Sequence, residues 1–173
     1  MNEPIVEGNC GELCNYHCCR SHDDEGSLGM YLLPEEFEAV QKQLDVSYEV
    51  HSSYAYDLPR GTKKLYYIFC SNDSGCLRNH RPIQCRTYPL EPHVINGTLC
   101  FIIEKNQFHS CPLIHQTELW RREFLEGIYK GWEVLLTIES IKKYVEALSL
   151  TRESEQNIGK SFDKNDIFNL CQN

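Results

Sequence analysis

The chain has 173 residues, a length that fits a single domain with or without a tail. Hydrophobic residues make up 41% of it and charged residues 24%, which is ordinary for a globular protein and excludes a wholly disordered or collagen-like chain. The formal net charge of −8 disfavours nucleic acid and anionic membranes as partners, because both carry negative charge themselves.

The ten cysteines are the unusual part of the composition. The first residues are acidic and include Pro4, so they do not resemble a secretory signal, and the sequence has no apolar run of membrane-spanning length. We therefore expect a cytoplasmic protein, in which thiols stay reduced and a disulfide framework does not form. At this density, cysteines in such a protein indicate metal ligation or redox chemistry.

Residues 1–9 are predicted to be a loose arm, and the cysteine-rich residues 10–20 have two alternative structures. In an α-helix capped by Asn9, the first three cysteines would recur every four residues and share one face. Alternatively, the segment wraps a metal ion as a loop, which Gly11 would permit.

One helix and one strand are predicted in the next part of the chain. Pro34 and the two glutamates after it favour a helix over residues 34–44, because proline suits the first helical turn and carboxylates stabilise the positive end of the helix dipole. Residues 64–69 are rich in aromatic and branched apolar side chains, and they predict a strand that ends at Cys70.

The second half of the chain contains a hairpin signal and a helical signal. Residues 93–103 predict a β-hairpin, since Asn96-Gly97 is a preferred pair for a type I′ turn. Apolar residues at steps of three and four predict one helix over 116–148, or two helices with a break near 137–140. The residues expected on its buried face are Trp120, Phe124, Ile128, Trp132 and Leu135.

These elements predict an α+β fold, in which a small antiparallel sheet carries cysteine-rich metal-binding loops and a long C-terminal helix or helix pair packs against it. The strands near 64–69 and 93–103 would belong to that sheet. Residues 1–150 would form a single cysteine-cluster metal-binding domain. Residues 151–173 would be a polar linker and a short C-terminal tail.

Three cysteine motifs are distinctive. Residues 10–19 read C-x3-C-x3-C-C, residues 70–76 read C-x5-C, and residues 81–89 read R-P-x2-C-R-x-Y-P. Together with a later cysteine at Cys111, this combination resembles the YkgJ-type cysteine-cluster family, whose members are described as zinc- or iron-chelating proteins. The resemblance covers about residues 10–112, although the family's first motif is usually C-x2-C-x2-C-C and each gap here is one residue longer.

The resemblance implies that eight cysteines bind metal ions, as an iron–sulfur cluster or as zinc. These metal ligands are Cys10, Cys14, Cys18, Cys19, Cys70, Cys76, Cys85 and Cys111. Because a structural zinc ion or an iron–sulfur cluster typically takes four thiolates, eight ligands suggest two adjacent sites or one polynuclear centre. The side chains of Cys18 and Cys19 diverge, so we expect them to serve two sites or to bridge two metals.

Arg78, Arg81 and Arg86 lie among the motif cysteines and are the predicted cofactor-binding residues. Thiolate-bound metal sites carry net negative charge, and nearby cations or backbone N–H groups must offset it. The alternatives for these arginines are pairing with surface carboxylates, or binding of an anionic substrate group by Arg81 or Arg86.

Two functions from different classes remain open on the sequence. The first is a metal-binding protein with a structural, redox or metal-handling role. The second is an enzyme that modifies a peptide or protein side chain, because flagellin lysine N-methylases have similar cysteine motifs and are associated with an iron–sulfur cluster. The chain shows no nucleotide-binding glycine motif, and the peptide or protein partner stays unknown.

Overall fold

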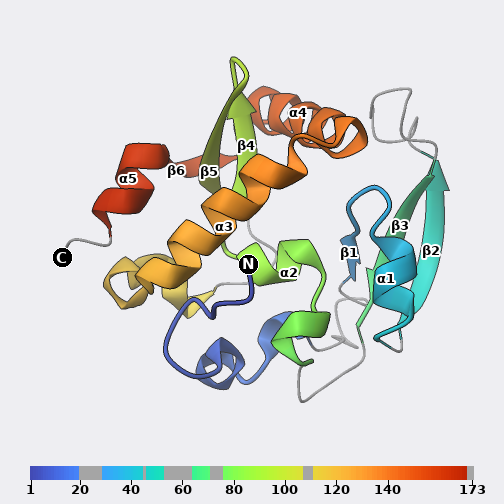
Figure 1. The fold of residues 1–173 in the computed structure, drawn as a ribbon, viewed down its shortest axis with the longest axis horizontal. Coiled ribbons are helices and arrows are strands. Elements are labelled where there is room, and N and C mark those ends of the chain that lie inside the picture. The colour runs from blue at the N-terminus through green and yellow to red at the C-terminus, as the bar shows by residue number, and fades with distance from the viewer. Residues whose placement is uncertain (20–28, 45, 53–63, 71–75, 107–110, 171–173) are drawn as a thin grey trace.

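The computed structural model describes residues 1–19, 29–44, 46–52, 64–70, 76–106 and 111–170. It contains helices and two antiparallel sheets of three strands each, so the predicted α+β class is confirmed (Figure 1). The prediction of one sheet containing residues 64–69 and 93–103 is wrong, because these strands belong to different sheets. Within the described residues, no helix is both long and apolar enough to cross a membrane.

The first sheet has the strand order β1-β3-β2 and is built from Gly29–Tyr31, Lys64–Phe69 and Ser47–Ser52, respectively. Its central strand coincides with the strand predicted at 64–69. The short helix α1 (Phe37–Gln41) packs on this sheet, where Leu32, Val40 and Ile68 form a small buried cluster. Thus α1 is shorter than predicted.

The second sheet has the order β4-β5-β6, formed by Glu91–Ile95, Thr98–Glu104 and Ile158–Phe162. The predicted hairpin is confirmed as β4 and β5. Both turn residues have positive φ angles, 50° at Asn96 and 78° at Gly97, and these are the backbone angles that an Asn-Gly turn supplies at little steric cost.

The residues after 150 are part of the folded domain, so the predicted linker and tail are wrong. The helix α4 (Glu139–Ser154) runs through the proposed boundary, and β6 then pairs with β5. A further helix, α5 (Lys164–Asn169), begins with a capping box at Asp163. The polar composition of this stretch concealed the strand, because β6 lies at the edge of the sheet and most of its side chains are exposed. Phe162, its last residue, is buried.

The long helical pattern forms two helices, so the predicted alternative of two helices with a break near 137–140 is confirmed. Helix α3 (Arg122–Leu135) ends where Thr137 turns the chain, and its hydroxyl donates to the carbonyl oxygen of Val134 at 2.7 Å. Helix α4 begins two residues later. The residues before α3 form short 3-10 helices, η5 (Pro112–His115) and η6 (Thr117–Leu119), rather than the α-helix predicted from 116.

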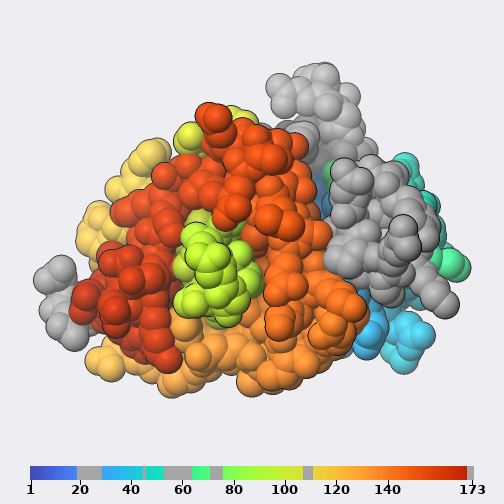
Figure 2. Space-filling model, turned by 90° about the horizontal axis from the view of Figure 1, so that it is seen from above, coloured from blue at the N-terminus to red at the C-terminus, as the bar shows by residue number. Residues whose placement is uncertain are grey.

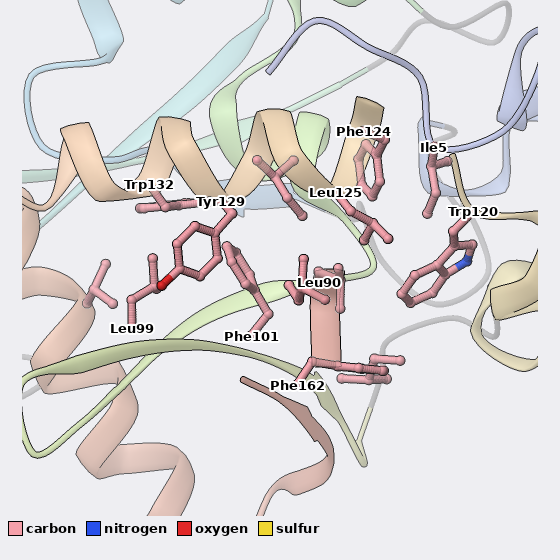
Figure 3. Packing of buried hydrophobic residues seen from close by; sticks show 14 of the residues in the cluster. Ile5, Leu90, Leu99, Phe101, Trp120, Phe124, Leu125, Tyr129, Trp132 and Phe162 are labelled. Atoms are coloured by element: carbon pink, nitrogen blue, oxygen red, sulfur yellow. The ribbon is translucent and has the colours of Figure 1, made fainter. Parts of the chain in front are cut away.

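The main core lies between α3 and the second sheet (Figure 3). Phe124, Ile128 and Trp132 of α3 are fully buried, and Phe101 of β5 packs in the same cluster. Ile5 also belongs to this core, and its carbonyl oxygen accepts a hydrogen bond from the Arg121 N–H at 2.8 Å. The N-terminal residues are therefore packed against the domain instead of forming a loose arm.

The first sheet lies at one side of the molecule in Figure 1, and the second sheet lies nearer the middle, on the side toward α5. Figure 2 shows the hairpin of β4 and β5 between α4 and the C-terminal segment, with the first sheet on the far side of α4. In Figure 1, the segments that carry the first cysteine motif and residues 78–80 lie on the lower side of the molecule, and residues 83–87 lie higher, near its middle. They consist mainly of very short helices: η1 (Cys10–Cys14), η2 (His17–Cys19), η4 (Arg78–His80) and α2 (Ile83–Thr87).

Candidate metal centre

The first cysteine motif folds as two 3-10 helices separated by a reversal of the backbone. Asn15 and Tyr16 have φ angles of 52° and 57°, so a continuous α-helix over 10–20 is wrong. The predicted cap is present in a modified form, because the Asn9 side chain accepts a hydrogen bond from the Gly11 N–H at 3.2 Å. This geometry is nearer to the alternative of a loop that wraps around a centre.

Gly11 has a specific role in that loop. The ring of Tyr16 lies directly over it, so that any side chain at Gly11 would collide with the ring. The Tyr16 hydroxyl accepts a hydrogen bond from the Asn9 side-chain amide at 3.0 Å. The backbone reversal between Cys14 and Cys18 is therefore stabilised by Tyr16 packing on a glycine.

The other predicted ligands come from four separate places in the fold. Cys70 directly follows β3, Cys76 precedes η4, Cys85 lies in α2, and Cys111 precedes η5. Cys10, Cys14, Cys18, these four and Cys100 are not in disulfide bonds. Cys19 ends η2, but its side chain lies outside what the structure describes, as does the whole of Cys171.

Four of the thiols form a first group, which comprises Cys18, Cys70, Cys76 and Cys85. Burial raises the pKa of Cys85 well above the ordinary thiol value, and negative charge on Cys70, Cys18 and Cys76 raises it further. Burial also raises the pKa of Cys70, with contributions from Cys76 and Cys18. Such mutual repulsion means that these sulfur atoms lie within electrostatic range of one another.

The remaining thiols form a second group, which comprises Cys10, Cys14, Cys18 and Cys111. Burial raises the pKa of Cys111 to about 11, and charge on Cys14, Cys10 and Cys18 contributes to the increase. Cys18 therefore interacts with both groups. The two groups are therefore neighbours, and the pair of adjacent metal sites stays a prediction.

The thiols are near one another but are not in ligand geometry. Among the residues that the structure describes, no three Cys, His, Asp or Glu side chains are close enough together to hold a metal ion as they stand. The donor chemistry is suited to zinc or iron, which thiolates bind well. A shared metal would require the side chains of each group to turn inward.

The three predicted arginines hydrogen-bond to the backbone around the cysteine motif. Arg86 donates to the carbonyl oxygens of Arg81 at 2.6 Å and Asn79 at 2.9 Å. Arg81 donates to the carbonyl oxygen of Cys76 at 3.2 Å, and Arg78 donates to that of Arg86 at 2.9 Å. These bonds fix the course of residues 76–86, which carry two of the predicted ligands.

The arginines also connect this loop to the start of the chain. Arg78 donates to the carbonyl oxygen of Asn2 at 2.8 Å, and Arg86 donates to the Asn2 side-chain oxygen at 3.0 Å. Burial and the neighbouring Arg81 lower the pKa of Arg78 to about 10, while negative charge at Cys10 acts in the opposite direction. Arg78 thus lies within electrostatic range of the second thiol group.

Glu36 and Met30 are two residues at the site that the sequence did not single out. The Glu36 carboxylate accepts hydrogen bonds from the N–H groups of Ile83 at 2.6 Å and Leu33 at 3.0 Å, which joins α2 to the first sheet. Its pKa is raised by burial, and the two backbone donors oppose that rise. The thiol of Cys85 contacts the Met30 thioether, with 3.0 Å between the sulfur atoms.

A pocket of about 630 Å³ lies elsewhere, beside β5 and β6. Its polar lining includes Lys105, His115 and Lys160. Among the described residues that line it, none is a predicted cysteine ligand or one of the three predicted arginines. It therefore gives no support to a substrate site beside Arg86.

Comparison with protein families, with curated proteins and with solved structures finds no match to this chain. The similarity to the YkgJ-type cysteine-cluster family therefore depends on the motif residues themselves.

Proposed function

We propose that this protein binds metal through its cysteine thiolates, as zinc or as an iron–sulfur cluster, in a structural, redox or metal-handling role. The observation that carries the proposal is the gathering of thiols from five separate segments into two neighbouring groups that have Cys18 in common. The proposal locates the protein in the cytoplasm, where its thiols remain reduced and available.

Without a metal, ionisation of these gathered thiols is unfavourable. Burial and mutual repulsion both oppose ionisation of Cys85 and Cys70, so the metal-free protein keeps these thiols protonated. A bound cation removes that penalty, because it takes the thiolates as ligands and releases their protons. Metal affinity should consequently fall as the pH is lowered.

The backbone around the thiols supports the same function. Hydrogen bonds from Arg81 and Arg86 fix the carbonyl groups between Cys76 and Cys85, so this loop is held in one conformation before any ligand arrives. The aromatic packing of Tyr16 on Gly11 does the same for the first motif. Preorganised ligand segments lower the ordering cost of metal binding.

The test is metal analysis with absorption spectroscopy on protein that is purified without oxygen. Stoichiometric iron with a broad visible absorption band is the expected result for an iron–sulfur cluster, and stoichiometric zinc in a colourless protein is the expected result for zinc. Protein that carries no metal, and that takes up neither zinc nor iron with sulfide when these are supplied, overturns the proposal.

Variants separate the two groups. Cys85→Ser should reduce the metal content of the first group, and Cys111→Ser should reduce that of the second, while each variant retains the metal of the other group. Cys100→Ser is the matched control, because Cys100 is a buried cysteine of β5 whose neighbours are Ser161 and two acidic residues rather than other thiols. Equal metal loss in all three variants would argue against the assignment of ligands.

A further inference from the structure

Met30 brings a second kind of sulfur atom, a thioether, to the first thiol group. Its thioether sulfur lies 3.0 Å from the Cys85 thiol, with Met30 in β1 and Cys85 in α2. The contact joins residues 55 positions apart in the sequence, so neither motif spacing nor local pattern predicts it.

The pairing of β1 with β3 places Cys70 on the same side. Met30 lies opposite Ile68 in the antiparallel register, and Cys70 is two residues beyond Ile68, so the alternation of the pleat directs all three to one face. Met30 and Cys70 both pack against the small cluster that contains Ile68. Met30 thus contacts Cys85 directly and shares its apolar neighbours with Cys70, which makes a neighbourhood of three sulfur atoms.

The close approach of β1 to β3 depends on a glycine. A Cβ atom at Gly29 would lie 2.7 Å from the carbonyl oxygen of Ile68 and would also collide with the ring of Tyr67. Glycine at this position therefore lets the strand come near enough for the next residue, Met30, to reach the thiols.

The three sulfur atoms differ in charge, and that difference points to one class of metal ion. A thioether is a neutral soft donor, so it adds a ligand without adding negative charge to a partly buried site. The hydrogen bonds of Arg78 and Arg86 go to backbone carbonyls and to Asn2, so these guanidinium groups already have other partners. A site that combines a small number of thiolates with one thioether suits a soft ion of low charge. Among biological metals, mixed Cys and Met donors favour Cu(I).

We propose that Met30, Cys70 and Cys85 form a three-sulfur site that binds a soft monovalent metal ion, Cu(I). This inference rests on the proposed metal-binding function and specifies it for the first thiol group, where it assigns a metal-handling role. Met30 is the residue that gives the group its preference for Cu(I) over zinc.

The experiment compares Cu(I) and Zn(II) affinities in oxygen-free competition with chromogenic chelators. Met30→Leu keeps the volume and removes the sulfur, so its Cu(I) affinity should fall by about tenfold or more while its Zn(II) affinity stays within about twofold of the wild type. The control is Ile68→Leu, which disturbs packing at the residue opposite Met30 and should leave both affinities unchanged.

A second measurement does not depend on any substitution in the core. The chain has two methionines, and the side chain of the other one, Met1, lies against Gly131 of α3. In selenomethionine-labelled protein loaded with Cu(I), selenium X-ray absorption should show a copper neighbour for about half of the selenium.

The outcomes separate the two proposals. Equal Cu(I) affinity in wild type and Met30→Leu, or a selenium spectrum without copper, overturns the role of Met30. A wild-type protein that binds zinc or an iron–sulfur cluster but no Cu(I) overturns this inference and leaves the proposed function standing. A wild-type protein that binds none of these metals overturns both.

Discussion

The half of the molecule around the second sheet and the half that carries the cysteines are stabilised in different ways. Around β4, β5 and β6, large side chains such as Phe101, Phe124 and Trp132 are fully buried in one continuous core (Figure 3). Around the thiols, the elements are short, and the first sheet contributes Leu65 to the edge of the main core and otherwise has only a small separate cluster of Leu32, Val40 and Ile68 among its described residues. Apolar burial stabilises the first region in proportion to its area, and the second has less of it.

The cysteine half compensates with hydrogen bonds to its own backbone. Arg78, Arg81 and Arg86 each donate to a carbonyl oxygen within residues 76–86, and Glu36 accepts from the start of α2. Such bonds fix a conformation but add only about 0.5–1.5 kcal/mol each to the net stability. The comparison therefore predicts that the second-sheet half stays folded without metal, and that the cysteine half depends on metal for most of its stability.

The largest effect is expected in the apolar half. Phe124→Ala removes a fully buried ring from the first turn of α3 and should lower the free energy of unfolding by about 3–5 kcal/mol, because it leaves a cavity in the main core. Denaturant titration of wild type and variant measures this loss. It should be the same with and without added metal.

Val134→Ala is the control on the same helix, since Val134 is 66% exposed. That variant should change the stability by less than about 0.5 kcal/mol. If the loss in Phe124→Ala doubled when metal was removed, the two halves would be coupled and the comparison would have to be abandoned.

The next effect concerns a buried charge in the apolar half. Burial raises the pKa of Glu91 from 4.5 to about 7, although the guanidinium of Arg152 lies 3.4 Å away and opposes the shift, and Glu104 adds to it. The folded protein binds this proton more tightly than the unfolded chain does. Stability from this group is therefore complete below pH 4.5 and is lost as the pH rises to about 7.

Glu91→Gln removes that dependence because the amide stays neutral. The variant should gain on the wild type between pH 5 and pH 8 by an amount on the order of 2 kcal/mol, measured as the difference between their unfolding free energies at each pH. The difference isolates Glu91 from every other titrating group. A difference that stays constant, or one that reverses sign, would show that the Arg152 ion pair outweighs burial.

The two halves also differ in how far the sequence predicts them. The hairpin of β4 and β5 and the break after α3 follow from local signals, the Asn96-Gly97 turn and the end of the helical period near Thr137. The pairing of β6 with β5 joins residues about 60 positions apart, and polar composition conceals it. Local patterns contain no information on such pairings, which depend on the packing of the whole chain.

The same limit applies more strongly to the candidate metal centre. The motifs identify the thiols, and seven of them lie within electrostatic range of another motif thiol. The sequence could not show that Arg86 hydrogen-bonds with Asn2, 84 residues away, or that Met30 contacts Cys85. Side-chain chemistry is thus readable from a motif, whereas the partners of each side chain depend on contacts between distant segments.

A moderate effect is expected from the arginines of the cysteine half. Arg86→Gln removes three hydrogen bonds, to Arg81, Asn79 and Asn2, and should lower the stability of the metal-free protein by about 1–2 kcal/mol. It should also speed the loss of metal to a chelator. Arg86→Lys should not restore either property, because a lysine ammonium cannot reproduce the planar fork that serves several carbonyls.

Arg122→Gln is the matched control, since Arg122 is 63% exposed on α3 and pairs with Glu126 on the same helix. It should leave metal retention unchanged. If Arg86→Gln kept its stability but lost metal as completely as Cys85→Ser, the arginine would act on the metal directly, and its assignment to the backbone would be wrong.

A small effect is expected at the tip of the hairpin, in the apolar half. Gly97 has a φ angle of 78°, so Gly97→Ala forces an alanine into a left-handed conformation and should cost about 1 kcal/mol at the tip of the hairpin. A Cβ atom there meets no neighbour within 4 Å, so the loss reports backbone strain alone. Denaturant titration should give the same loss in metal-free and metal-loaded protein, because the hairpin belongs to the half that does not need metal.

Asn96→Gly is the control, as glycine adopts the Asn96 φ angle of 50° freely and should change stability by only a few tenths of a kcal/mol. A loss in Gly97→Ala that disappears when metal is bound would mean that metal binding reorganises the second sheet, and the division of the molecule into an apolar half and a metal-dependent half would not hold.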